Sequence, residues 1–77
     1  MSVRSRVFAI VCDLCHREDD WIQFSDVVAQ WIREGGRRKS AEFVVTMALG
    51  LLRKRGLVEA QELNDTSFWR VPRITKG

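Results

Sequence analysis

The chain has 77 residues, of which 45% are hydrophobic and 30% are charged, and its formal net charge is +3 at pH 7. A chain this short closes one hydrophobic core, and this composition is typical of globular proteins, so we expect a single domain over residues 1–77. The sequence contains neither an apolar stretch of the roughly 20 residues that cross a bilayer nor a recognisable signal peptide. We therefore expect a protein of the cytoplasm, or of the nucleoid or nucleus, without a membrane partner.

The positive charge is concentrated in two short clusters. Between positions 37 and 55 the chain has six basic residues and one acidic residue, Glu42. The basic residues are Arg37, Arg38 and Lys39 in the first cluster and Arg53, Lys54 and Arg55 in the second. Clustered cations are typical of surfaces that bind phosphate groups. The alternative explanation is a solvated surface, or in the second cluster a set of charges that complements a helix dipole.

Cys12, Cys15 and His16 form the string C-x-x-C-H, which in other proteins attaches c-type haem. Haem attachment would require export and a second axial ligand, and a structural zinc site would require a fourth ligand. A redox pair would require the first cysteine at the start of a helix that follows a strand. The surrounding residues instead have the pattern of an amphipathic helix. We therefore expect two largely buried packing cysteines in a reducing compartment, and neither a metal nor a cofactor.

Two helices are predicted in the first half of the chain. Apolar side chains at positions 7, 10, 11, 14 and 15 predict a core-facing helix over residues 4–17, followed by an extended segment at 21–24. A second helix is predicted over residues 26–34, with Ser25 as its N-cap and Gly35-Gly36 as its end, because glycine readily adopts the left-handed conformation. Its apolar stripe comprises Val27, Val28, Trp31 and Ile32.

The longest predicted helix covers residues 41–55. Ser40 is its predicted N-cap and Gly56 the residue that ends it. Apolar residues at positions 44, 47, 48, 51 and 52 predict its core-facing stripe, which Val45 and Leu49 flank.

A β-hairpin is predicted at the end of the chain. Its strands are residues 57–63 and 68–71, Asn64 and Asp65 form the turn, and Pro72 ends the second strand. The predicted fold is therefore mainly α, with three helices and a two- or three-stranded antiparallel sheet. This order of elements resembles a winged-helix domain across nearly the whole chain. The resemblance is carried by residues 22–27, by the segment LLRKRGLV at 51–58 and by residues 68–71.

The winged-helix resemblance implies that the third helix lies in the major groove of DNA and that the hairpin contacts a nearby phosphate or the minor groove. We expect the nucleic-acid-binding residues to be Arg37, Arg38, Lys39, Ser40, Glu42, Phe43, Thr46, Arg53, Arg70 and Arg73. The cations would pair with phosphates, Phe43 and Thr46 would pack on a thymine methyl group, and Glu42 would accept a hydrogen bond from cytosine. The expected function is that of a transcriptional regulator on duplex DNA. We expect a homodimer, paired through the first helix or the apolar flank of the third.

Two features favour another class of function. The third helix is apolar nearly all round, and the hairpin tip carries Asp65, which would repel a phosphate. Residues 24–32 and 68–70 are similar to DEP domains, which dock at membranes and receptors, so a protein-interaction module is the alternative. Trp21, Trp31 and Trp69 would then be interface anchors, although packing in a small core explains them more simply.

The sequence does not predict an enzyme. His16 is the only histidine, and it is expected to be exposed at the end of the first helix. Gly35-Gly36 lacks the lysine and the preceding strand of a phosphate-binding loop. Ser25 and Ser40 are explained by their roles as helix caps.

Overall fold

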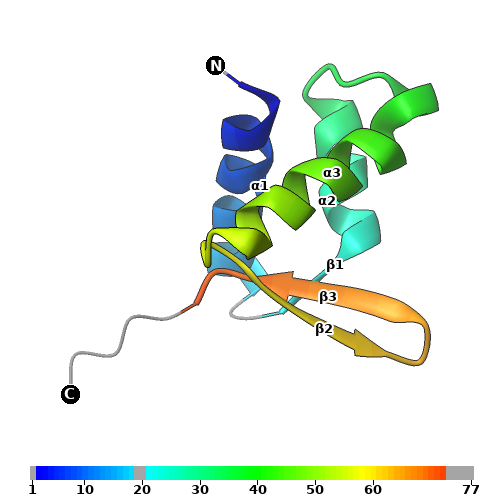
Figure 1. The fold of residues 1–77 in the computed structure, drawn as a ribbon. Helices are drawn as coiled ribbons and strands as arrows, with labels where there is room; N and C mark the ends of the chain where they lie inside the picture. Colours follow the sequence, from blue (N-terminus) through cyan, green and yellow to red (C-terminus); the bar gives the residue numbers. More distant parts are fainter. Residues whose placement is uncertain (1, 19–20, 73–77) are drawn as a thin grey trace.

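The computed structural model describes residues 2–18 and 21–72 of the chain. Three helices cover one face of a small antiparallel sheet (Figure 1). In chain order the elements are α1 (Val3–Glu18), β1 (Ile22–Gln23), α2 (Phe24–Arg33), the 3₁₀ helix η1 (Arg38–Ser40), α3 (Ala41–Lys54), β2 (Glu59–Leu63) and β3 (Thr66–Arg70). The predicted mainly helical fold with a small sheet is therefore confirmed, as is the order of its elements. Within the described ranges, every helix is too short or too polar to cross a bilayer.

The sheet has the strand order β1-β3-β2, with β3 in the middle. Trp69 lies opposite Ile22 on one side and Ala60 on the other, so these three side chains share the face that the helices cover. Asn64 and Asp65 both have positive φ, 50° and 63°, as a two-residue hairpin turn of type I′ requires. The predicted turn is therefore confirmed.

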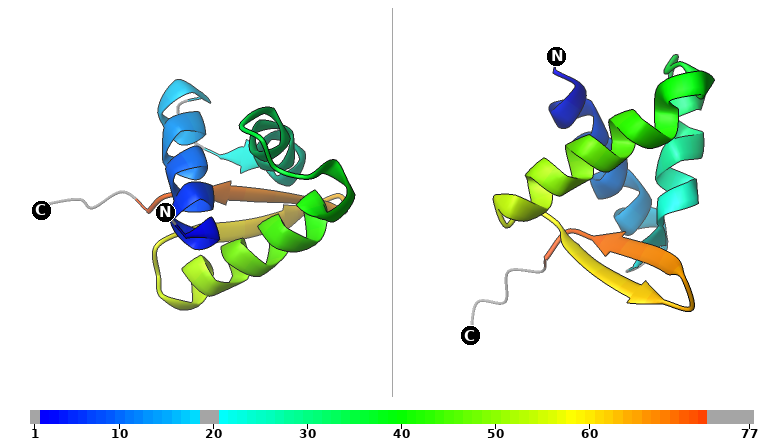
Figure 2. Two further views of the ribbon diagram at one scale, coloured as in Figure 1. Left: turned by 90° about the horizontal axis from the view of Figure 1, so that it is seen from above. Right: turned by 45° about the vertical axis from the view of Figure 1, so that its right-hand side comes forward.

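The hydrophobic core lies between the three helices and the inner face of the sheet. Figure 2 shows α3 lying across α1 and α2, and both of these helices pack against it. The buried core residues are Val7, Ile10, Val11, Ile22, Val27, Trp31, Ala41, Val45, Ala48, Leu49, Leu52 and Val58. Trp31 is 6% exposed and Trp69 is half-buried against this core, as packing residues would be, whereas Trp21 is half-buried outside the core, beside Arg70.

The buried stripe of α3 differs from the predicted one. Ala41, Val45, Ala48, Leu49 and Leu52 are buried, whereas position 44 is half-buried and positions 47 and 51 are exposed. The prediction was therefore wrong at positions 47 and 51, whereas Val44 packs against the core from the edge of the buried stripe. The physical reason is that α3 carries two overlapping apolar stripes, each with helical spacing. Contact with both α1 and α2 selects the stripe of smaller residues, which includes two alanines.

Glycines end α2 and α3 as predicted. Gly35 and Gly56 have φ values of 105° and 75°, the left-handed conformation. At the end of α3, the amide of Gly56 donates to the carbonyl of Arg53 at 3.0 Å and the amide of Leu57 donates to that of Leu52 at 2.9 Å. This double hydrogen bond is the Schellman motif, and it turns the chain from α3 toward the hairpin.

The predicted serine caps were wrong in detail. Helix α2 begins at Phe24, one residue before Ser25, because β1 leads directly into it and extended Gln23 occupies the N-cap position. Ser40 does precede α3, but its side chain makes no capping hydrogen bond. The preceding η1 turn provides a carbonyl instead, since the amide of Ala41 donates to the carbonyl of Arg38.

Candidate nucleic-acid interface

Arg37, Arg38 and Lys39, here called the 37–39 cluster, connect α2 to α3. Arg37 is extended, and the other two residues lie in η1 immediately before α3. All three side chains are exposed, as is Ser40. None of the three cations forms an ion pair with a carboxylate in the described part of the chain. The 37–39 cluster is therefore available to an external anion, next to the positive end of the α3 dipole.

The turn before the 37–39 cluster is held against the core by Gly36. A Cβ atom at Gly36 would overlap the Nε1, Cδ1 and Cε2 atoms of the buried Trp31 indole. The guanidinium of Arg6 lies 4.9 Å from the centroid of the same Trp31 ring, and its Nη2 donates to the carbonyl of Glu34 at 3.0 Å. Gly36 and Arg6 both contact Trp31. These contacts hold α1, the end of α2 and the 37–39 cluster in a defined relative position.

The exposed residues of α3 form a continuous surface along the helix, here called the outer face of α3. They are Glu42, Phe43, Thr46, Met47, Gly50, Leu51, Arg53 and Lys54. The predicted site residues of α3 all belong to this set, so the fold brings them together next to the 37–39 cluster. Sequence reasoning missed Met47, Gly50, Leu51 and Lys54. The helical period could not show that Met47 and Leu51 are exposed, because the apolar residues of α3 fit two alternative buried faces equally well.

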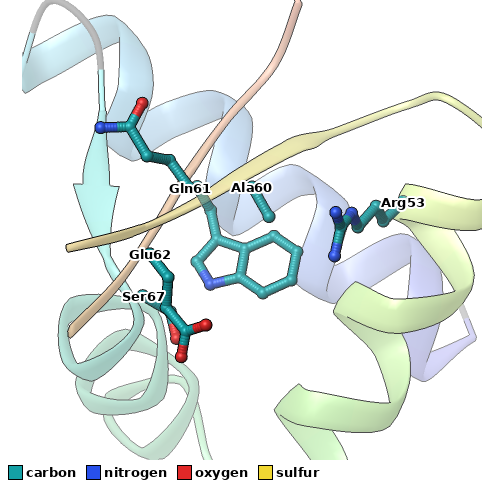
Figure 3. Close-up of a pocket in the computed structure, with 6 residues that line it drawn as sticks. Arg53, Ala60, Gln61, Glu62 and Ser67 are labelled. Atoms are coloured by element: carbon teal, nitrogen blue, oxygen red, sulfur yellow. The ribbon is translucent and has the colours of Figure 1, made fainter. Parts of the chain in front are cut away.

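Arg53 lies at the side of the outer face that faces the hairpin. It lines a pocket of about 230 Å³ together with Ala60, Gln61, Glu62, Ser67 and Trp69. Figure 3 shows Arg53 pointing from α3 toward the strands that carry Glu62 and Ser67. The indole N–H of Trp69 is buried there without a hydrogen-bond partner among the described residues. Since Arg53 and Glu62 bring opposite charges to this pocket, it has no excess positive charge to hold a phosphate.

Arg70 is engaged within the sheet. Its Nε donates to Oε2 of Glu59 at 2.7 Å, and its guanidinium carbon lies 4.4 Å from the centroid of the Trp21 ring. Glu59 and Arg70 are opposite residues of β2 and β3, on the sheet face away from the helices. The ion pair offsets the charge that a phosphate clamp would need, so we leave Arg70 out of the interface. Arg73, the other predicted clamp, lies outside the described residues.

The cysteines lie on α1 and are half-buried. Burial, and then the proximity of Cys15, raises the pKa of the Cys12 thiol above its ordinary value. The Sγ atom of Cys15 lies 4.0 Å from the carbonyl oxygen of Trp69, and His16 is exposed. Across residues 2–18 and 21–72, no three His, Cys, Asp or Glu side chains are grouped closely enough to hold a metal ion.

Comparison with protein-family models, with curated proteins and with solved structures gives no match.

Proposed function

We propose that this protein binds duplex DNA with the outer face of α3 in the major groove and the 37–39 cluster on the phosphate backbone. The proposal is carried by the 37–39 cluster. Its three exposed cations form no ion pairs among the described residues, and they lie directly before α3. The resemblance of the sequence to winged-helix domains supports the same placement of α3. Phosphate contacts of this kind supply most of the affinity and position the reading helix.

The distribution of charge along α3 matches a groove between two phosphate backbones. Helix α3 has 14 residues, and a helix of that length spans about 21 Å. The 37–39 cluster lies at its first end, and exposed Arg53, Lys54 and Arg55 lie at its last end. The major groove of B-DNA is about 12 Å wide, so cations at the two ends of a helix inside it come close to opposite backbones.

The hairpin has a smaller part in this proposal. Three acidic side chains of the hairpin, Glu59, Glu62 and Asp65, are exposed or half-buried. The cation Arg70 is paired with Glu59. An acidic hairpin repels phosphates, so the hairpin does not clamp the DNA backbone in this arrangement.

We also propose that the protein acts as a homodimer, because a net charge of +3 gives one chain little electrostatic affinity for DNA. Two α3 helices would then enter half-sites about one helical turn apart. Helix α1 is the interface that leaves the outer face of α3 free for DNA. Sedimentation of the protein with and without duplex tests this arrangement.

The decisive experiment removes the 37–39 cluster. We expect the triple variant Arg37→Ala, Arg38→Ala, Lys39→Ala to bind a 24-base-pair duplex pool of random sequence more weakly than the natural chain. We also expect a shallower plot of log K against log salt concentration, because each lost phosphate contact reduces the slope by about 0.9. Fluorescence anisotropy across a salt series measures both quantities.

A control variant, Arg33→Ala, removes an exposed charge from α2, outside both α1 and the 37–39 cluster, and should change affinity much less. Circular dichroism should show that both variants keep the fold, since all the changed side chains in the 37–39 cluster are exposed. Equal affinity and equal salt dependence for the triple variant and the natural chain would contradict the proposal.

A protein-docking module is the second candidate function. It is favoured by the exposed apolar side chains Phe43, Met47 and Leu51, which lie on one side of α3. The two functions separate in the same assay, because a docking module without nucleic-acid affinity would bind no duplex even at low salt.

A further inference from the structure

Gly50 is in the middle of the outer face of α3, where the protein's own fold does not require a glycine. A Cβ atom at this position meets no other atom within 4 Å, and the residue is exposed. Glycine inside a helix is less favourable than alanine by about 1 kcal/mol. A glycine at such a position leaves room for another molecule to approach the α3 backbone closely.

Large apolar side chains lie on the same side of α3 as this glycine. Phe43 is 71% exposed, Met47 is 54% exposed and Leu51 is 45% exposed. They are spaced four residues apart and therefore lie one above the other on the helix surface. Thr46 is the one exposed residue between Glu42 and Arg53 whose side chain can form a hydrogen bond. The middle of the outer face is thus apolar and nearly without hydrogen-bonding groups, while its two ends are cationic.

The charges disfavour a second copy of the chain as the occupant of this face. Parallel pairing of two α3 helices would place one 37–39 cluster beside the other. Antiparallel pairing would place the 37–39 cluster beside Arg53, Lys54 and Arg55 of the second copy. Both arrangements bring like charges together, which disfavours association. The occupant must therefore be anionic at both ends of α3 and apolar in between.

Thymine-containing duplex DNA has this pattern. Phosphates border the major groove on both sides, and the apolar group that base pairs display inside it is the C5-methyl group of thymine. The usual partners of guanine and adenine in the groove are arginine, lysine, asparagine and glutamine side chains. The middle of the outer face of α3 has none of these four residue types.

We infer that the outer face of α3 recognises thymine methyl groups, with Phe43 and Met47 packed on them and Gly50 at the closest approach of the helix to the groove. This inference rests on the proposed function, because it specifies which sequences the same surface prefers. It predicts an affinity difference that depends on a single methyl group per base.

The test compares thymine with uracil in otherwise identical duplexes. The probe is a duplex obtained by repeated selection of a random-sequence pool for binding to the full chain. The selected sequence is then prepared with dT, or with dU at every thymine position. Uracil keeps the base pair and the O4 acceptor but lacks the methyl group. Burial of one methyl-sized group corresponds to about fourfold in affinity, so we expect the dU duplex to bind at least about fourfold more weakly.

Substitutions on the outer face connect this difference to named residues. Phe43→Ser with Met47→Ser should remove the preference for dT and leave the fold intact, because both side chains are exposed. Leu63→Ser also removes an exposed apolar side chain, at the end of β2, and should keep the preference. Gly50→Ala should weaken binding to both duplexes while stabilising the protein, a combination that a purely structural role would not produce.

The outcomes separate this inference from the function on which it rests. Salt-dependent binding with equal affinities for dT and dU would overturn thymine recognition and leave DNA binding in place. Unchanged binding by Gly50→Ala would overturn the close approach at Gly50. Binding to neither duplex would overturn both proposals.

Discussion

Alanine at Gly36 and alanine at Gly50 should change the stability of this protein in opposite directions. At Gly36 the new Cβ would overlap three atoms of the Trp31 indole, which is 6% exposed and also contacts Arg6. The indole is held by the core and has little freedom to move away. At Gly50 the same methyl group meets nothing within 4 Å.

The two free energies can be approximated from these surroundings. Forcing an extra methyl group into a packed site costs about 1–3 kcal/mol, and the lower chain entropy of the unfolded alanine variant returns about 0.4–1 kcal/mol. Gly36→Ala should therefore lower the free energy of unfolding by about 1–2 kcal/mol. Gly50→Ala should raise it by about 1 kcal/mol, the difference in helix propensity. For a domain of this size, the two melting temperatures should differ by about 10–20 °C.

Thermal unfolding followed by circular dichroism at 222 nm measures this difference. Tryptophan fluorescence provides a second readout, because Gly36→Ala displaces Trp31 from its packing position and Gly50→Ala does not. The reasoning would be refuted if Gly36→Ala melted at or above the temperature of the natural chain. It would be equally refuted if the two variants melted together.

Two further predictions concern the core and the cysteines. Leu49→Ala, at a fully buried position, should lower the free energy of unfolding by about 2–5 kcal/mol. Met47→Ala, at an exposed position, should change it by less than about 0.5 kcal/mol. Similar losses for the two variants in urea unfolding would mean that α3 buries a different face. Because burial raises the pKa of the Cys12 thiol, its alkylation by iodoacetamide at pH 8 should be slower than in the urea-unfolded chain. The unfolded chain ionises this thiol first, so the contribution of Cys12 to stability should decline as the pH rises above the ordinary thiol pKa. Cys12→Ala should remove that decline, and an alkylation rate equal to that of the unfolded chain would contradict the raised pKa.

The helices were predictable from the sequence because their signals are local. The predicted first helix, residues 4–17, differs from Val3–Glu18 by one residue at each end. Gly35 and Gly56 end their helices as expected, since the left-handed conformation of a C-terminal glycine depends on few neighbours. The serine caps failed for the opposite reason. Whether a hydroxyl caps a helix depends on the path of the preceding chain, which is β1 before α2 and η1 before α3.

The candidate site was predictable in part. The exposure of the 37–39 cluster follows from its charge, because three adjacent cations cannot be buried without partners. The engagement of Arg70 was not predictable, since it depends on the strand register that places Glu59 opposite to it. The openness around Gly50 was not predictable either, because a glycine in a helical pattern can equally mark close packing within the chain.

By itself, the sequence determined that three amphipathic helices and a hairpin form, where the helices end, and that a cationic segment precedes α3. These features depend on hydrogen bonds and side-chain preferences within a few residues of the chain. The tertiary structure decided which apolar stripe of α3 is buried. Both stripes have helical spacing, and only packing against α1 and α2 distinguishes them. That packing leaves Phe43, Met47 and Leu51 on the surface, where they form the apolar middle of the outer face.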